Sequence, residues 1–252
     1  MINIILSGCG GAMGRAVSAR AQSLGCAIVA GIDPGADLQV SYPVFDSAAQ
    51  CTAKADVIVD FSHPSALEEL LELARQSGTP LVLATTGLDD AQLARVRMAA
   101  EQTPIFFSFN MSLGINLMSS LAKVATKVLG GQFDIEIIEK HHNRKLDAPS
   151  GTALMLADAV SGELAAPPEY IHERNSKRQP RGKNEIGLHA VRGGTIVGEH
   201  DVIFAGQDET LTISHTATSK GVFAEGALSA ALFMRGRAAG LYNMGDLIGQ
   251  TQ

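Results

Sequence analysis

The densest group of chemically active side chains lies between Glu139 and Ala153. This segment reads EKHHNRKLDAPSGTA, so two histidines, an arginine and two lysines fall within 139–145. The residues Pro-Ser-Gly-Thr that follow open a predicted helix, whose first turn offers N–H donors to an anion. Cations beside a helix N-terminus suit a substrate that carries carboxylates. The simpler alternative is a solvated basic turn with Ser150 as a helix cap.

A second group is rich in glycine. The segment GCGGAMGR at 8–15 lies between a predicted strand and a predicted helix. It fails the pattern G-x-G-x-x-G because Met13 occupies the last position, but it fits G-x-x-G-x-x-G through Gly8, Gly11 and Gly14. Glycines at such a junction allow a tight turn and bring backbone N–H groups to a pyrophosphate. We therefore expect a dinucleotide loop here.

Asp33 stands nineteen residues beyond Gly14, at the end of the second predicted strand. A carboxylate at this place accepts hydrogen bonds from the adenosine ribose and repels a 2′-phosphate. Because Pro34 follows it, no basic residue offsets that charge. The sequence predicts that NADH is favoured, with NADPH as the alternative cofactor.

Short runs of apolar residues alternate with helical patterns over the first part of the chain. Strands are expected at 2–6, 27–32, 57–61, 81–84 and 105–108, and helices at 15–24, 64–76 and 89–102. This alternation predicts βαβ units and a parallel sheet. The loops ATTG at 84–87 and SFNM at 108–111 follow two of these strands, where doubly wound sheets bind ligands.

The pattern changes in the second part. Helices are expected at 112–129 and 150–160, and strands at 133–138, 186–191, 197–204 and 210–216. Glycine-rich turns join the last three strands, which predicts antiparallel hairpins. The fold class is thus α/β, a Rossmann-like doubly wound parallel sheet plus an inserted α+β domain with a mixed sheet. A helix at 224–235 returns to the first domain, so we expect domains at 1–112 (plus 223–252) and 113–222.

Composition excludes several classes of protein. The 252 residues carry 20 Lys and Arg against 26 Asp and Glu, a net charge of −6, which argues against a general nucleic-acid binder. Three cysteines without C-x-x-C spacing indicate free thiols in a cytoplasmic protein, and no metal site is expected. No apolar run reaches the roughly 18 residues of a membrane span.

The chain resembles the dihydrodipicolinate reductase family, now called 4-hydroxy-tetrahydrodipicolinate reductase, over essentially its whole length. The resemblance is carried by GCGGAMGR at 8–15, DFSHP at 60–64, ATTG at 84–87, FNMSLGIN at 109–116 and EKHHNRKLDAPSGTA at 139–153. The last of these is close to a family signature. The resemblance implies a homotetrameric enzyme of lysine and diaminopimelate biosynthesis that transfers hydride from NADH or NADPH to a cyclic imine dicarboxylate.

The resemblance also implies residue roles. His141 is expected to act as the acid/base residue and Lys145 as the proton donor, although the four-residue spacing leaves open which of them supplies the proton. His142, Gly151 and Thr152 are expected to bind the substrate carboxylates. The expected cofactor-binding residues are Gly8, Cys9, Gly10, Gly11, Ala12, Met13, Asp33, Ala84, Thr85, Thr86, Ser108, Phe109, Asn110 and Met111.

Two positions depart from the family pattern, and two other functions compete. Ala84 stands where the family usually has Gly, and Pro34 stands where many members have a basic residue. The competing functions are a related reductase of another imine or keto acid, and a non-catalytic dinucleotide sensor, which would need neither His141 nor Lys145. The basic segment 172–183 is interpreted as a solvated loop, with a lid or subunit contact as its alternative.

Overall fold

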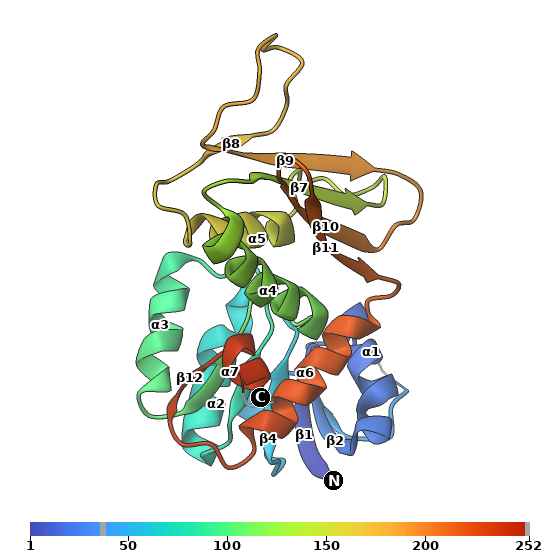
Figure 1. Ribbon diagram of the computed structural model, residues 1–252. Helices are drawn as coiled ribbons and strands as arrows, with labels where there is room; N and C mark the ends of the chain where they lie inside the picture. The colour runs from blue at the N-terminus through green and yellow to red at the C-terminus, as the bar shows by residue number, and fades with distance from the viewer. Residues whose placement is uncertain (36–38, 250–252) are drawn as a thin grey trace. The chain divides into compact units, whose positions relative to one another are not determined.

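The computed structural model describes residues 1–35 and 39–249. The chain divides into two units, Met1–Leu113 with Lys220–Gln252 and Gly114–Ser219 (Figure 1). Residues 36–38, three positions beyond Asp33, lie outside the described residues. In the part of the chain that is described, no helix is long and apolar enough to cross a membrane.

Within the described residues, seven parallel strands form the sheet of the first unit, in the order β12-β6-β5-β4-β1-β2-β3. The strands are β1 (Ile2–Ser7), β2 (Cys26–Ile32), β3 (Val44–Phe45), β4 (Val57–Asp60), β5 (Leu81–Leu83), β6 (Pro104–Phe107) and β12 (Gly240–Tyr242). The helices are α1 (Ala12–Ala21), α2 (Leu67–Ser77), α3 (Asp90–Ala100), α6 (Gly221–Met234) and α7 (Met244–Gly249). The expected doubly wound parallel sheet is confirmed.

The last residues of the central strands lie in one row. Ser7 pairs with Ile32 on one side and with Asp60 on the other. Asp60 in turn pairs with Leu83, and Leu83 with Phe107. Because all these strands run in the same direction, the segments that follow them leave the sheet at one edge. This register places the glycine loop, Asp33 and the loops after β4, β5 and β6 side by side.

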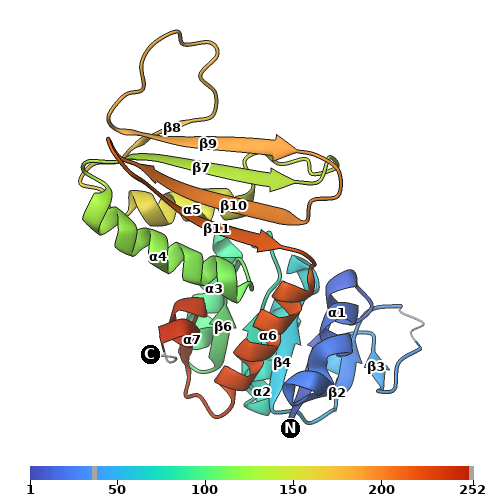
Figure 2. The same cartoon turned by 45° about the vertical axis from the view of Figure 1, so that its right-hand side comes forward.

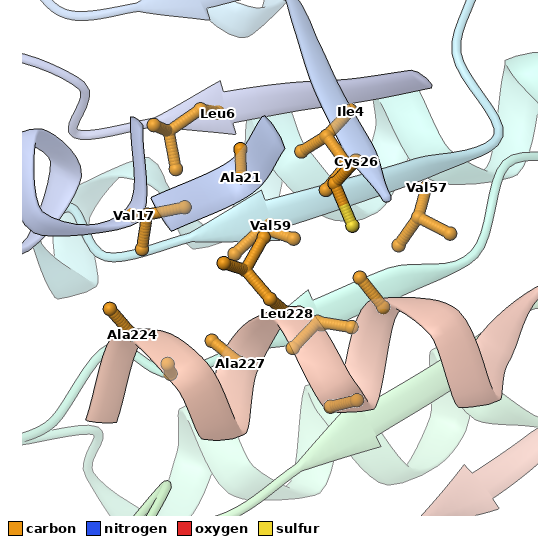
Figure 3. Packing of buried hydrophobic residues seen from close by; sticks show 14 of the residues in the cluster. Ile4, Leu6, Val17, Ala21, Cys26, Val57, Val59, Ala224, Ala227 and Leu228 are labelled. Atoms are coloured by element: carbon orange, nitrogen blue, oxygen red, sulfur yellow. The ribbon is translucent and has the colours of Figure 1, made fainter. Parts of the chain in front are cut away.

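Helices cover both faces of this sheet. Helices α1 and α6 pack on one face, where Val17 and Leu228 meet Val59 of β4 (Figure 3). Helices α2 and α3 pack on the other face against β5 and its neighbours (Figure 2). Helix α6 is rich in alanine, and its buried Gly226 allows a close approach, because a Cβ there would lie 1.6 Å from the Met111 carbonyl oxygen. Helix α6 therefore packs within the first unit, next to the loop after β6.

Helix ends agree with the sequence signals. Gly25 and Gly78 have φ angles of 73° and 65°, and they end the segments of α1 and α2 in the left-handed conformation that glycine favours. Helix α1 is followed by a 3-10 turn, and Pro64–Ala66 forms another before α2. Strands β3 and β12 and helix α7 were not predicted from the sequence, because they are too short to show a period.

The second unit has a mixed sheet. In the described residues its five strands follow the order β11-β10-β7-β9-β8. They are β7 (Asp134–His141), β8 (Glu169–Ile171), β9 (Glu185–Arg192), β10 (Gly198–Ala205) and β11 (Thr210–Ala217). Helices α4 (Leu113–Leu129) and α5 (Gly151–Ser161) cover one face, with Phe204 among the buried residues between them and the sheet.

One expected hairpin is wrong. Strands β10 and β11 form an antiparallel hairpin as expected, but β9 and β10 do not pair. Strand β7 lies between them, parallel to β9 and antiparallel to β10. The turn at 193–197 therefore crosses over the end of β7. Alternation within each strand could not reveal this, because the inserted strand lies far away in the sequence.

Candidate active site

The glycine loop has a backbone that only glycine allows. Gly8 follows β1 with a φ angle of 74°, and a Cβ there would lie 2.7 Å from the Phe61 carbonyl oxygen. Gly14, in the first turns of α1, would place a Cβ 2.2 Å from the Gly8 carbonyl oxygen. Gly11 is the N-cap of α1, and no side chain caps it. A tight turn against an uncapped helix N-terminus fits a dinucleotide pyrophosphate.

Asp33 is fixed against this loop. Its Oδ2 accepts a hydrogen bond from the Gly10 N–H at 2.8 Å. Cys9 contributes only backbone to the loop surface, since its side chain is buried next to Gly31. Burial, with the charge of Asp33 as a further cause, raises the pKa of the Cys9 thiol. The thiol is therefore packed in the core rather than aimed at a ligand.

A buried carboxylate supports the loop after β5. Asp60 is 1% exposed at the end of β4, and its Oδ2 accepts a hydrogen bond from Thr85 Oγ1 at 2.5 Å. Its Oδ1 accepts from the hydroxyl and the backbone N–H of Ser62. The hydroxyl of Thr85 is thus bound to Asp60, whereas Thr86 is exposed. Asp60 is the first residue of the DFSHP motif at 60–64, but no role was predicted for it from the sequence.

The loop after β6 is also held by its own side chains. Ser108 Oγ donates to the Asn110 carbonyl at 2.8 Å, and Asn110 Oδ1 accepts from the Ser112 N–H at 2.8 Å. Phe109 is 65% exposed, whereas Met111 is 3% exposed and belongs to the core. Of the four expected cofactor residues in this loop, Met111 therefore offers its backbone only.

In the second unit, one face of β7 changes from apolar to charged along its length. Ile135 and Ile137 are buried under the helices, and alternation places Glu139 and His141 on the same face. Glu139 is fully buried at 0% exposure, and the His141 side chain is 12% exposed. His141 Nδ1 lies 2.6 Å from Glu139 Oε2. Because a carboxylate only accepts hydrogen bonds, the ring nitrogen is the donor.

Arg192 neutralises this carboxylate from β9. Its Nη1 and Nη2 donate to the two Glu139 oxygens at 2.7 and 2.6 Å, a bidentate pair. The Ser150 N–H donates to Glu139 Oε1 at 3.0 Å. Burial opposes ionisation, but the hydrogen bonds from Arg192 and His141 outweigh it and hold the pKa of Glu139 below its usual range.

A second histidine flanks the first. The rings of His141 and His200 meet edge to face with centroids 5.3 Å apart, and His200 Nε2 lies 3.2 Å from Ser150 Oγ. Burial, assisted by the charge of His141, lowers the pKa of His200 from 6.5 to about 4, so this ring is neutral at pH 7. Glu139, Arg192 and His200 come from the three strands β7, β9 and β10, and none of them was assigned a role from the sequence.

The loop between β7 and α5 carries the other expected residues. Lys145 Nζ lies 2.8 Å from Asp147 Oδ1, which is an ion pair with an exposed carboxylate. The hydrogen bond from Lys145 lowers the pKa of Asp147. His142 Nδ1 is buried and has no hydrogen-bond partner among the residues that the structure describes. A buried ring nitrogen without a partner is a place where a ligand can bind.

Helix α5 begins directly beyond this loop. Ser150 is its N-cap, and its Oγ accepts from the Ala153 N–H at 3.1 Å. Gly151 and Thr152, expected to bind carboxylates, are the first two residues of the helix. The expected group of His141, His142, Lys145, Gly151 and Thr152 therefore lies within a single strand–loop–helix segment. In residues 1–35 and 39–249 there is no cluster of His, Cys, Asp or Glu side chains that could hold a metal ion.

The basic segment 172–183 is only partly a solvated loop. Arg181 donates to Glu136 Oε1 and Asp134 Oδ1 at 3.0 and 2.9 Å, and its side chain is 17% exposed. Arg174 binds Glu136 and Glu185 at 2.9 and 2.7 Å. These two arginines fasten the ends of the segment to β7 and β9, whereas the residues between them are exposed.

A doubly wound sheet with a glycine loop, joined to a unit with a carboxylate-bound histidine and a basic loop, defines a Rossmann-type oxidoreductase. Two family models match the chain: the N-terminal part of dihydrodipicolinate reductase over residues 2–111 and the C-terminal part over 114–248. The chain belongs to the dihydrodipicolinate reductase family.

Relatives and solved structures agree with this membership. The 4-hydroxy-tetrahydrodipicolinate reductase of Caldanaerobacter subterraneus is 51% identical over 98% of both chains. That of Clostridium novyi is 47% identical over 98% of both chains. A dipicolinate-bound dihydrodipicolinate reductase from Paenisporosarcina sp. TG-14 superposes with a TM-score of 0.80 at 25% identity, covering 96% of this chain and 97% of that one. A Mycobacterium smegmatis amine dehydrogenase shares the fold, with a TM-score of 0.64 at 12% identity over 96% of this chain and 95% of that one.

Proposed function

We propose that this chain reduces 4-hydroxy-tetrahydrodipicolinate to tetrahydrodipicolinate with hydride from a reduced nicotinamide, as a step of lysine and diaminopimelate biosynthesis. The reaction adds a hydride and a proton to the substrate and releases its hydroxyl as water. The single observation that carries the proposal is His141, fixed by buried Glu139 beside a loop of cations and a helix N-terminus. Family membership supports the substrate.

The chain's own residues supply binding and a proton. His142, Gly151 and Thr152 bind the carboxylates of the substrate. The cationic side chains of the loop and the N-terminus of α5 favour these negative charges. The buried His142 Nδ1, which has no partner within the described ranges, supports its place in the set. His141 and Lys145 hold the proton that the substrate ring takes up after hydride transfer. Lys145 has to leave Asp147 to reach a substrate. The cost is small because the Asp147 carboxylate is exposed, so water can solvate it once Lys145 has moved.

The first unit holds the cofactor, whose role when bound is to supply the hydride. The residues proposed to line it are Gly8 to Met13, Asp33, Ala84 to Thr86 and Ser108 to Met111. NADH is the favoured cofactor, because Asp33 is held on the glycine loop where a 2′-phosphate would meet its charge. We further propose a cytoplasmic homotetramer, and the three free cysteines support a reducing compartment.

A coupled assay tests this function. Pyruvate and aspartate semialdehyde with their synthase generate the unstable substrate in situ, and nicotinamide absorbance is followed when the protein is added, with NADH and NADPH in parallel. We expect rapid oxidation that requires the synthase and is faster with NADH. Binding of NADH without such oxidation would instead favour a dinucleotide sensor or a reductase of another imine or keto acid.

A further inference from the structure

Glu139 is a fully buried carboxylate with four hydrogen-bond donors around it. Arg192 donates hydrogen bonds to both carboxylate oxygens, and the Ser150 N–H donates to Oε1. His141 Nδ1 donates to Oε2 at 2.6 Å. Arg192 alone neutralises the charge, so the bond to His141 is not needed to compensate a buried ion. The carboxylate therefore has a second consequence, which concerns the histidine ring.

That consequence is the position of the proton on the ring. With Nδ1–H donated to Glu139, a neutral His141 has an unprotonated Nε2, and a protonated ring exchanges its proton through Nε2. The ring is also held from the side of β10, where His200 packs against it edge to face and a Cβ on Gly198 would lie 3.2 Å from Nε2. His200 is neutral at pH 7, whereas Glu139 is a charged group in direct contact with the His141 ring.

We propose that Glu139 is the positioning residue of His141: it fixes the ring at the end of β7 with Nδ1 protonated, so that Nε2 exchanges the proton with the substrate. The importance of this for catalysis rests on the proposed function. Glu139 itself does not touch the reacting atoms. Arg192 and the Ser150 N–H keep the carboxylate ionised and fixed for this purpose.

The substitution Glu139→Gln tests the proposal through its hydrogen-bond geometry. The amide oxygen can occupy only one of the two carboxylate oxygen positions. The Oε1 position faces two obligatory donors, the Ser150 N–H and Arg192 Nη2, so the amide oxygen belongs there. The NH₂ group then takes the Oε2 position, where it loses the bond from Arg192 Nη1 and faces His141 Nδ1. That ring nitrogen can accept only if the ring proton moves to Nε2. We therefore expect the variant to reverse the tautomer of His141.

The strand offers a matched control. Glu136 also contacts two arginines and a histidine, Arg174, Arg181 and His189, but its side chain lies on the other face of β7. Glu136→Gln removes a comparable charge from the same strand without touching His141. A readout that separates the two variants reports positioning rather than general loss of structure.

Two measurements test whether Glu139 positions the His141 ring. Long-range ¹H–¹⁵N NMR correlations, with the His141 signals assigned by their loss in His141→Gln, are expected to show Nδ1–H in the wild-type protein and in Glu136→Gln, and Nε2–H in Glu139→Gln. In the coupled assay, Glu139→Gln is expected to lower kcat roughly 100-fold, the lower end of what a positioned general acid or base contributes, with KM changed much less. Glu136→Gln is expected to keep a kcat close to wild type.

Several results would overturn the proposal. Nε2–H in the neutral wild-type ring would do so without any variant, even if Glu139→Gln failed to fold. So would equal loss of kcat in both variants, or an unchanged kcat in Glu139→Gln. A wild-type protein with Nδ1–H but no synthase-dependent oxidation would instead contradict the proposed function and leave the ring assignment standing.

Discussion

Lys145 is the residue whose loss separates proton supply from cofactor binding most clearly. Because it is assigned to the substrate and lies in the second unit, Lys145→Ala is expected to lower kcat about 100-fold, the lower range for loss of a general acid. The dissociation constant for NADH, measured by fluorescence titration, is expected to stay close to wild type. Lys140→Ala is the control, since Lys140 pairs with Glu199 and Asp201 instead. Equal loss of kcat and NADH affinity would contradict the role of Lys145.

Asp33 is the residue on which the cofactor preference depends. Asp33→Ala removes the charge that faces a 2′-phosphate, so we expect the ratio of kcat/KM for NADH to that for NADPH to fall. Asp56→Ala is a matched control: Asp56 also accepts a backbone N–H, that of Asn3 at 2.7 Å, but it precedes β4 at the opposite edge of the sheet. A ratio that rises in Asp33→Ala would show that the ribose assignment is wrong.

The site residues could be predicted from the sequence only where the motif is continuous. His141, His142, Lys145, Gly151 and Thr152 lie in one segment, so their types and spacing were visible. Arg192 binds Glu139 across 53 positions, and His200 meets Ser150 across 50. No local pattern encodes such contacts. No role was predicted for Glu139 because the strand was expected to end at Ile138. Residues 139–141 were therefore expected in a loop rather than on β7, where Glu139 and His141 share the face of Ile135 and Ile137.

At the scale of elements, the turn between β1 and α1 depends on Gly8. Gly8 and Gly25 have nearly the same φ angle, 74° and 73°, but only Gly8 has neighbouring atoms within 4 Å of an added Cβ. Gly25→Ala is expected to cost the roughly 1–2 kcal/mol of the left-handed conformation. Gly8→Ala carries that cost and a clash with Phe61, so urea denaturation is expected to show a larger loss, with weaker NADH binding.

Equal effects of the two substitutions on both stability and NADH affinity would show that the glycine loop is an ordinary turn.

The βαβ order of the first unit could be predicted from the sequence. Glycine at strand ends and alternation between strand and helix are local signals. The three-residue strands β8 and β12 have none, and β7 entered between β9 and β10 through pairing distant in sequence.

At the scale of the whole molecule, buried His200 links folding stability to pH. Its pKa is lowered from 6.5 to about 4 by burial, so between these values the unfolded chain binds a proton that the folded chain does not. Stability is therefore full above about pH 6.5, falls by about 3 kcal/mol as pH drops to about 4, and levels off below that for this group. Burial also lowers the pKa of His215, which adds to the same decline.

Urea denaturation between pH 7 and pH 4 measures this linkage. The variant His200→Gln is expected to have a smaller decline in unfolding free energy over that range, although its stability at pH 7 is lower. The exposed His172 gives the control His172→Gln, which is expected to keep the wild-type decline. An unchanged decline in His200→Gln would show that His200 does not titrate in this way.

We propose that the whole molecule transfers hydride from a reduced nicotinamide to the cyclic imine dicarboxylate. The most direct measurement uses NADH that carries deuterium at both C4 positions, with substrate generated by the synthase and the product examined by mass spectrometry. We expect tetrahydrodipicolinate that carries one deuterium and forms only when the protein is present. Product without deuterium, or no product despite bound NADH, would contradict it.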